Sequence, residues 1–260
     1  MTIATTSHKA SRSLVQHASV LAFALAGTAV ILLALAPLGW RAGWWHFRFS
    51  LLTLLPWAAY FGIAALIASV VTILLGPSRI GWRGMAIATA ALVVGGLIAY
   101  VPWHYDQLRQ TLPPIHDITT DTEHPPAFSA AIAALRTDEH DNPAVYEGSK
   151  IAEQQRQAYP AIAPLMIPLA PDAAFNRALD TARQMGWTIL AADDKSGQIE
   201  ASDRSRWMGF TDDIVIRVAQ ADAGSRIDLR SSSRLGRSDF GVNAARVSAY
   251  LMKLRAAAAG

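Results

Sequence analysis

The chain of 260 residues contains no cysteine, and its first 105 residues contain no Asp or Glu. The absence of cysteine excludes disulfides, thiol catalysis and the common cysteine zinc sites. The absence of acidic residues from the N-terminal part leaves three long uncharged stretches, residues 18–40, 49–78 and 84–105. About 20 apolar residues in a helix cross a hydrocarbon core about 30 Å thick. We therefore expect residues 1–105 to form an anchor of three transmembrane helices in a lipid bilayer.

The acidic residues are confined to the rest of the chain. All 20 follow Tyr105, and only 17 of the 23 basic residues lie there with them. Residues 106–260 therefore have a formal charge of −3, although the whole chain has +3. A nucleic-acid partner would require a basic stripe on this soluble part, so the sequence predicts no nucleic-acid binding. Its length is sufficient for one domain with its own core and a tether.

The charges that flank the apolar stretches predict an orientation. Three crossings put the N-terminus and the loop at residues 76–84 on one side, and the loop at residues 41–48 and the C-terminal region on the other. The first side carries Lys9, Arg12, Arg79 and Arg83, whereas the second side carries Arg41, Arg48 and Arg109. Because positive flanks favour the cytoplasm, this bias predicts a cytoplasmic N-terminus and an extracytoplasmic C-terminal domain.

The first apolar stretch also has one feature of a cleavable signal peptide. Residues 34–36 have the small-residue spacing of a cleavage site. However, Pro37 follows this segment, and the apolar run is longer than the roughly 7 to 15 residues of a signal core. The sequence therefore favours a retained transmembrane helix.

A transporter or channel is less consistent with these stretches than an anchor is. A translocation path normally requires ionisable groups at mid-membrane depth. Here every Arg lies in a loop, and His46 and His104 lie at the ends of the spans. Ala91, Gly95 and Ala99 follow one helix face at four-residue spacing, which indicates close helix packing.

The soluble part divides into two regions. Residues 106–160 are rich in Pro, Asp and Thr and predict an irregular extended arm, because Pro restricts the residue before it to extended conformations. In residues 161–257, helical spacing predicts one helix from Pro171 to a stop at Gly186 and a second after an N-cap at Ser238 or Asp239. Five strands are expected at residues 162–169, 187–191, 198–202, 213–218 and 226–232. The sequence predicts an α+β domain, an antiparallel sheet with two helices on its apolar face.

The last two strands have a favoured register. Pairing Ile216 with Leu229 keeps the apolar residues of both strands on one face. A slip of one residue would bury Arg230 among them. The same register places Arg217 directly opposite Asp228, as a cross-strand pair of opposite charge.

Several motifs in the soluble part resemble one known family. They are Gly209-Phe210-Thr211-Asp212-Asp213, Asp228-Leu229-Arg230-Ser231-Ser232-Ser233-Arg234-Leu235-Gly236 and Ser238-Asp239-Phe240-Gly241-Val242-Asn243, with Ile115-His116-Asp117-Ile118 and Pro125-Pro126-Ala127-Phe128 upstream. Together they resemble the bacterial domain-of-unknown-function family fourteen-ninety-nine, and the upstream motifs are similar to its membrane-anchored proteobacterial members. The resemblance implies no established activity. Some relatives have a cysteine in the arm, but this chain has none, so a thiol role is excluded here.

Polar residues gather in two places of the expected domain. Glu200, Asp213, Arg217, Asp228 and Arg230 are expected on the sheet face away from the helices. This face can be a solvated surface with weak ion pairs, or a recognition surface for an anionic or peptide-like partner. The loop before the last helix adds hydroxyls, a cation and a helix N-terminus. The candidate binding residues are Asp213, Arg217, Asp228, Arg230, Ser233, Arg234, Ser238, Asp239 and Asn243.

The sequence predicts no metal or other cofactor. Two groups of residues have side chains that can bind a metal ion. The first is His116, Asp117, Asp121, Glu123 and His124, and the second is Asp138, Glu139, His140 and Asp141. Neither lies on an expected helix or strand that would orient ligands. The chain also lacks a Gly-x-Ser-x-Gly nucleophile motif.

Two functions remain open at this point. The first is a non-enzymatic module at the outer face of a bacterial inner membrane, which binds an envelope protein or an anionic ligand of the envelope. The alternative is a membrane-anchored hydrolase or transferase that uses Asp212, Asp213 or Asp239 with Arg234.

Overall fold

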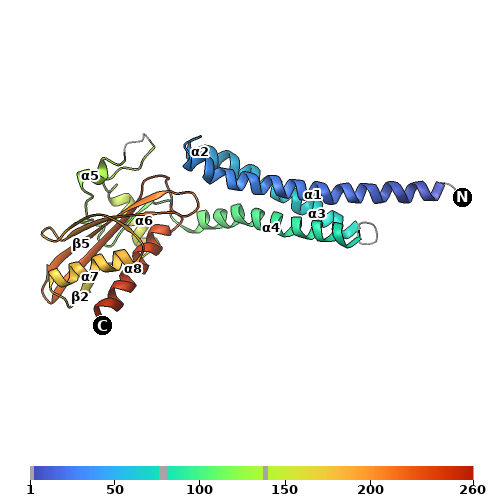
Figure 1. Ribbon diagram of the computed structural model, residues 1–260. Helices are drawn as coiled ribbons and strands as arrows, with labels where there is room; N and C mark the ends of the chain where they lie inside the picture. Colours follow the sequence, from blue (N-terminus) through green and yellow to red (C-terminus); the bar gives the residue numbers. More distant parts are fainter. Residues whose placement is uncertain (1–2, 76–80, 137–139, 260) are drawn as a thin grey trace. The chain divides into compact units, whose positions relative to one another are not determined.

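The computed structural model describes residues 3–75, 81–136 and 140–259 (Figure 1). The chain divides into two compact units, Met1–Gln107 and Leu108–Gly260. We describe each unit by itself.

The N-terminal unit consists of helices. They are α1 (Ile3–Arg41), α2 (Phe47–Phe49), the π-helix η1 (Ser50–Leu54), α3 (Leu55–Leu75) and α4 (Gly81–Thr111). In the described part of the chain, three segments are long and apolar enough to cross a membrane, His17–Arg41, Phe47–Leu74 and Gly81–Thr111. The prediction of three spanning helices is therefore confirmed. Arg79 lies outside the described residues, as do the side chains of Lys9 and Arg12.

Two glycines allow close contact between α3 and α4. A Cβ atom added to Gly95 would lie 2.6 Å from the carbonyl oxygen of Gly62, and one added to Gly62 would lie 3.2 Å from that of Gly95. Small residues allow helix backbones to approach in this way within membranes. Ala91 is buried beside them and Ala99 is half-buried. The four-residue spacing of small side chains therefore marks a packed helix face, as the sequence predicts.

The C-terminal unit is built on one antiparallel sheet. Within the described residues, six strands have the order β1-β6-β5-β4-β3, and β2 also pairs with β6. The strands are β1 (Asp117–Thr119), β2 (Leu165–Ile167), β3 (Thr188–Asp193), β4 (Gln198–Arg204), β5 (Thr211–Ala221) and β6 (Gly224–Ser233). The helices are α5 (Ala130–Ala133), α6 (Ser149–Ala158), α7 (Pro171–Gln184) and α8 (Val242–Ala259). Figure 1 shows α7 and α8 on one side of this sheet and α5 on the other.

The register of β5 and β6 agrees with the expected one. Ile216 faces Leu229, and Arg217 faces Asp228. Ile216 and Leu229 are both fully buried and belong to the main hydrophobic core. The alternation of apolar and polar residues determined this register, because a one-residue slip would exchange the two faces.

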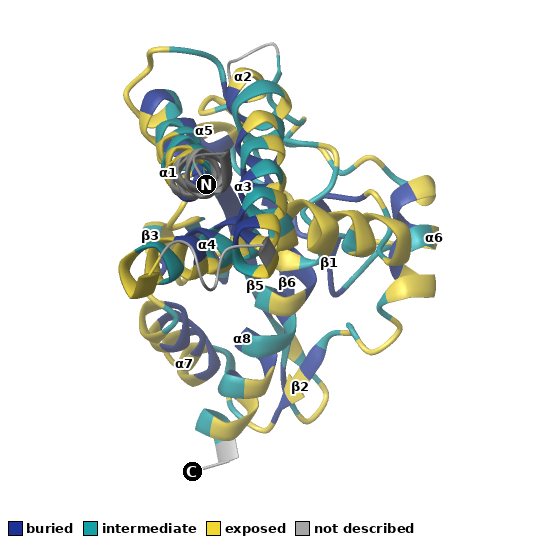
Figure 2. Cartoon of the chain, turned by 90° about the vertical axis from the view of Figure 1, so that its right-hand side faces the viewer, coloured by how far each residue is buried: buried dark blue, intermediate teal, exposed yellow. Residues whose placement is uncertain are grey.

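The two helices cover the apolar face of the sheet, as expected. In α7, the buried residues Phe175, Ala178 and Ala182 lie at helical spacing, and Figure 2 shows buried and exposed sides of this helix. In α8, Tyr250 is fully buried, stacks on Trp187 with a centroid distance of 5.1 Å and donates a hydrogen bond to the carbonyl oxygen of Ala178. The hydroxyl is satisfied inside the core, so the aromatic ring can be buried without an unpaired polar atom.

The structure corrects the expectation that residues 106–160 are irregular and contain no helix. This segment contains β1, which pairs with β6, and the helices α5 and α6. Gln155 of α6 binds the backbone of Thr119, accepting from its N–H and donating to its carbonyl oxygen. We call residues 117–136 and 140–147 the covering segment, because those that follow β1 lie on the face of the sheet opposite α7 and α8 and bond the side chains there.

The covering segment also corrects the interpretation of that face as a solvated surface. Glu200, Asp213, Asp228 and Arg230 expose at most 3 % of their surface. Ser129, at the N-cap of α5, donates to Glu200 from both its backbone N–H and its hydroxyl, each at 2.6 Å. The polar face is therefore an internal layer between the sheet and the covering segment.

Candidate binding site: an arginine layer under the covering segment

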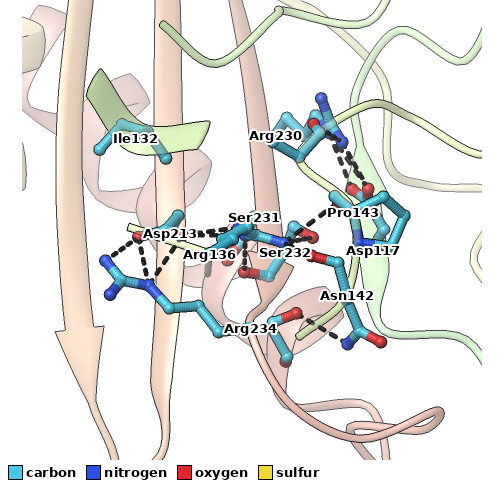
Figure 3. A network of polar contacts seen from close by, with 12 residues as sticks. Asp117, Ile132, Arg136, Asn142, Pro143, Asp213, Arg230, Ser231, Ser232 and Arg234 are labelled. Carbon is cyan, nitrogen blue, oxygen red and sulfur yellow. Dashed lines mark hydrogen bonds and ion pairs between the residues drawn. The ribbon is translucent and has the colours of Figure 1, made fainter. Parts of the chain in front are cut away.

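Asp213 lies at the centre of the first charge cluster in this layer. It is fully buried and accepts hydrogen bonds from two arginines, from Nε of Arg136 at 3.0 Å and from Nη2 of Arg234 at 2.7 Å (Figure 3). Arg136 comes from the covering segment, and it also donates to the carbonyl oxygen of Ser232. Burial lowers the pKa of Arg136, while the neighbouring Asp213 opposes that shift. The carboxylate therefore offsets the cost of burying a guanidinium.

Arg230 forms the second cluster. Its Nη2 and Nε donate to the two carboxylate oxygens of Asp117 at 2.7 and 3.0 Å, in the paired geometry that suits a guanidinium. Its charged carbon lies 4.6 Å from the ring centre of Phe128 and 5.5 Å from that of Tyr146, at cation–π distance. Burial, and then the charge of Asp117, raises the pKa of Tyr146 to about 12. This phenol therefore stays protonated at neutral pH.

Two backbone carbonyls complete the environment of Arg230. Nη2 also donates to the carbonyl oxygen of Ala144, and Nη1 donates to that of Pro126. A guanidinium has five N–H groups. Among the described residues, four of those of Arg230 therefore have an acceptor, and one N–H of Nη1 has none.

Asp228 is the centre of the third cluster. It is buried and bonds Arg217 at 2.9 Å and Arg226 at 3.0 Å, and both arginines also reach Asp121. The predicted pairing of Arg217 with Asp228 is therefore present. However, the expectation that both side chains are solvent-exposed is wrong for Asp228, because the covering segment supplies Asp121 and the Thr120 hydroxyl above it.

The residues of the final loop bond one another and the backbone. The side chain of Asn243 bonds the hydroxyls of Ser231 and Ser233 and the carbonyl oxygen of His116. Asp239 accepts from the backbone N–H groups of Gly241 and Asn243, so it caps the start of α8 as predicted. Burial raises the pKa of Asp239.

The remaining loop candidates have local roles. The Ser238 hydroxyl accepts from the backbone N–H of Phe240. Asp212 pairs with Arg246 of α8 at 2.6 Å, an arginine that the sequence analysis did not single out. The structure therefore divides the nine candidate residues into two groups. Asp213, Arg217, Asp228, Arg230 and Arg234 belong to the charge clusters under the covering segment. Ser233, Ser238, Asp239 and Asn243 bond one another or the backbone at the start of α8.

The histidines and acids considered as metal ligands are dispersed. In the ranges that the structure describes, no three His, Asp or Glu side chains are placed to hold a metal ion. Asp117 and Asp121 bind arginines instead, and His116 lies 3.7 Å from Glu147. Asp138 and Glu139 lie outside the described residues.

An open cavity lies above Arg230. Its volume is about 440 Å³, within the range of small-ligand sites. Two parts of the covering segment form its walls, around Phe128 and Ala133 on one side and Val145 and Tyr146 on the other, and Arg230 contributes to the lining. We call this space the Arg230 cavity. It combines apolar walls with a buried guanidinium that retains one hydrogen-bond donor.

Sequence reasoning did not find the covering half of this site. Asp117 was weighed only as a metal ligand, and Arg136 was not considered. The partner of Arg136 is 77 residues away, and that of Asp117 is 113 residues away. The spacing of neighbouring residues in the sequence cannot indicate pairs that are so far apart.

Comparison with protein families gives one match. A family model described as "Protein of unknown function (DUF1499)" matches residues 117–254, more than half of the chain. The match begins at the first residue of β1 and ends within α8, so it includes the covering segment as well as the sheet. A search of curated proteins found no match.

Proposed function

Because this chain belongs to the DUF1499 family of unknown function, we propose from its own geometry that it is a membrane-anchored binding protein. The three apolar helices hold it in the inner membrane of a bacterium, with the soluble unit outside the cytoplasm. The soluble unit binds a component of the cell envelope. The distribution of positive charges around the spans supports this orientation. The Arg230 cavity is the observation that carries the binding role.

The chemistry of the cavity favours an uncharged group. Asp117 already balances the charge of Arg230, so an anion placed here would add a second negative charge next to that carboxylate. The free N–H of Nη1 requires only an acceptor oxygen. An apolar group that carries a carbonyl or ether oxygen can pack against the apolar walls and accept a hydrogen bond from this N–H. Such a group suits the site better than a carboxylate or phosphate does.

The positions of three carboxylates support binding over hydrolysis or group transfer. Asp213 is held by two arginines, Asp212 is paired with Arg246, and Asp239 caps α8. Among the described residues that line the Arg230 cavity, none of these three appears. A general acid or base must reach the substrate, and these groups instead fix the positions of structural partners.

Photo-crosslinking in living cells tests this function. Val145 lines the cavity and is 77 % exposed, so a photoreactive phenylalanine analogue at this position should disturb the fold little. We expect a covalent adduct with an envelope component from position 145. The matched control is Met252 of α8, which is 65 % exposed and outside the cavity lining, and the same analogue there should give no such adduct.

A second substitution ties the adduct to the cavity. Ala133 is exposed and lines the same space, so Ala133→Trp should fill it and remove the adduct at position 145 while the protein level stays unchanged. Equal adducts from positions 145 and 252, or an adduct that persists with Ala133→Trp, would reject the Arg230 cavity as the binding site.

A further inference from the structure

A second cavity lies on the soluble unit, where the chain leaves α4. Its volume is about 460 Å³, and its lining is mainly apolar, with Leu112, Tyr159, Ile162, Phe240, Ala244 and Ala245 among the contributors. We call it the Leu112 cavity. Its walls come from the residue that follows α4, from the end of α6 and the loop after it, and from the start of α8. It shares no lining residue with the Arg230 cavity.

The backbone beside this cavity has an unusual conformation. Phe240 has a φ of +52°, and among the described residues it is the one non-glycine residue with a positive φ. Gly241 follows with a φ of +83°, and a Cβ atom there would lie 3.2 Å from Leu112 and 3.3 Å from the Tyr159 hydroxyl. A side chain larger than hydrogen at position 241 would narrow the cavity. Non-glycine residues are held in this conformation only where the surroundings enforce it, and such positions are frequent at ligand sites.

The cavity lining begins close in sequence to the end of the third apolar run. Leu112 directly follows α4, and Tyr105 is the last residue of the apolar run of that helix. Seven residues at about 1.5 Å per residue amount to about 10 Å along the helix. The polar headgroup layer is itself roughly 5 to 7 Å thick on each side of the bilayer. Arg109, four residues beyond Tyr105 or about 6 Å along the helix, therefore lies within the headgroup layer, and Leu112 lies about 3 to 5 Å outside that layer.

A cation lies on the same stretch of α4. Arg109 is exposed in the last turn of α4, and it precedes Leu112 by three residues. A guanidinium at headgroup depth complements a lipid phosphate. The apolar cavity and this cation together match the two chemically different parts of one phospholipid.

We infer that the Leu112 cavity binds one acyl chain of a bilayer phospholipid, whose phosphate pairs with Arg109. The occupant comes from the membrane in which the anchor lies, because the lining begins one residue after the spanning helix ends. This inference does not depend on the proposed function, since the two cavities are separate.

Labelling by photoactivatable lipid tests the inference on the full chain. The protein is reconstituted in vesicles of phosphatidylethanolamine and phosphatidylglycerol that contain a phosphatidylglycerol with a diazirine at the end of one acyl chain. After irradiation and digestion, adducts are mapped by mass spectrometry. We expect adducts on residues 158–162 and 240–248, in addition to those on the three spanning helices.

Two variants separate the cavity from chance contact with lipid. Ala245 is exposed and lines the cavity, so Ala245→Trp should abolish the adducts on residues 158–162 while labelling of the spanning helices is unchanged. Ala133→Trp, which fills the other cavity, should leave the adducts as they are. Arg109→Gln should lower their yield for phosphatidylglycerol. Adducts confined to the spanning helices, or adducts insensitive to Ala245→Trp, would overturn the inference.

Discussion

At the residue scale, the cost of breaking an ion pair depends on whether the charge that is left behind is buried and has another partner. Asp213 has no exposed surface, and Arg136 beside it has a side chain that is only 2 % exposed. Arg234, on the same carboxylate, is 20 % exposed. Removal of the carboxylate leaves the buried guanidinium of Arg136 without its ionic partner and without access to water. Removal of Arg234, in contrast, leaves Asp213 paired with Arg136. The two substitutions should therefore differ strongly in cost.

Asp213→Asn should lower the free energy of unfolding of the soluble unit by about 3 to 5 kcal/mol, the usual cost of breaking a buried ion pair. Arg234→Ala should cost less than about 2 kcal/mol, because the remaining pair is intact. Urea titration of residues 108–260 measures both. Equal and small losses would show that the Asp213 cluster is open to solvent and that the covering segment does not close over it.

Asp121 provides a prediction for acid. Burial would raise its pKa, but hydrogen bonds from the backbone N–H groups of His124 and Glu123 and the charges of Arg226 and Arg217 bring it below the usual 3.8. A depressed carboxyl pKa contributes stability above pH 3.8 that is lost as the pH falls through the lower value of the folded state. When the pH is lowered from 5 to below the folded-state pKa of Asp121, the free energy of unfolding should therefore fall further in the unsubstituted protein than in Asp121→Asn. Parallel losses in the two proteins would contradict a lowered pKa of Asp121 in the folded state.

At the element scale, the glycine contact between α3 and α4 should decide how the anchor packs. Gly95→Ala places a methyl group 2.6 Å from the carbonyl oxygen of Gly62, so the helices must separate. Overpacking of this kind costs roughly 1 to 3 kcal/mol. Gly27 of α1 has nothing within 4 Å of its added Cβ, and Gly27→Ala is the matched control. Thermal unfolding of the full chain in micelles should show a lower midpoint for Gly95→Ala alone. An unchanged midpoint would mean that the two helices do not touch there.

The elements that the sequence predicts well are those with a long periodic pattern. The alternation in β5 and β6 predicts their register, and the helical spacing after Pro171 predicts α7. The strand β1 is only three residues long and lies in a proline-rich region, so it has no period to detect. In α6, the buried residues Ile151, Ala152 and Gln155 lie at helical spacing, and this spacing is a sequence signal for that helix. The register also predicts the pair of Arg217 with Asp228. The partners that the covering segment supplies could not be predicted, because they are 77 to 113 residues away in the sequence and meet only in the folded domain.

At the scale of the whole molecule, the covering segment should be part of the folding unit. Residues 161–260 alone would lack β1 and the residues of the covering segment that bond Glu200, Asp213 and Arg230. We expect this fragment to lack a cooperative unfolding transition, whereas residues 108–260 should unfold cooperatively in urea. The boundary at residue 160 between an arm and a soluble domain remains a prediction from composition. A cooperative transition in residues 161–260 would support this boundary and would show that the covering segment is not required for folding.

At the scale of the whole molecule, binding of an envelope component also requires that the soluble unit lie outside the cytoplasm. The chain has no cysteine, so each single-cysteine variant carries one labelling site. Met252→Cys lies on the exposed surface of α8, and Ser7→Cys lies in the N-terminal segment before the first span. A membrane-impermeant maleimide applied to intact spheroplasts should label Met252→Cys at once and Ser7→Cys only after lysis. Labelling of Ser7→Cys before lysis, with Met252→Cys protected, would place the soluble unit in the cytoplasm and contradict a role in binding envelope components.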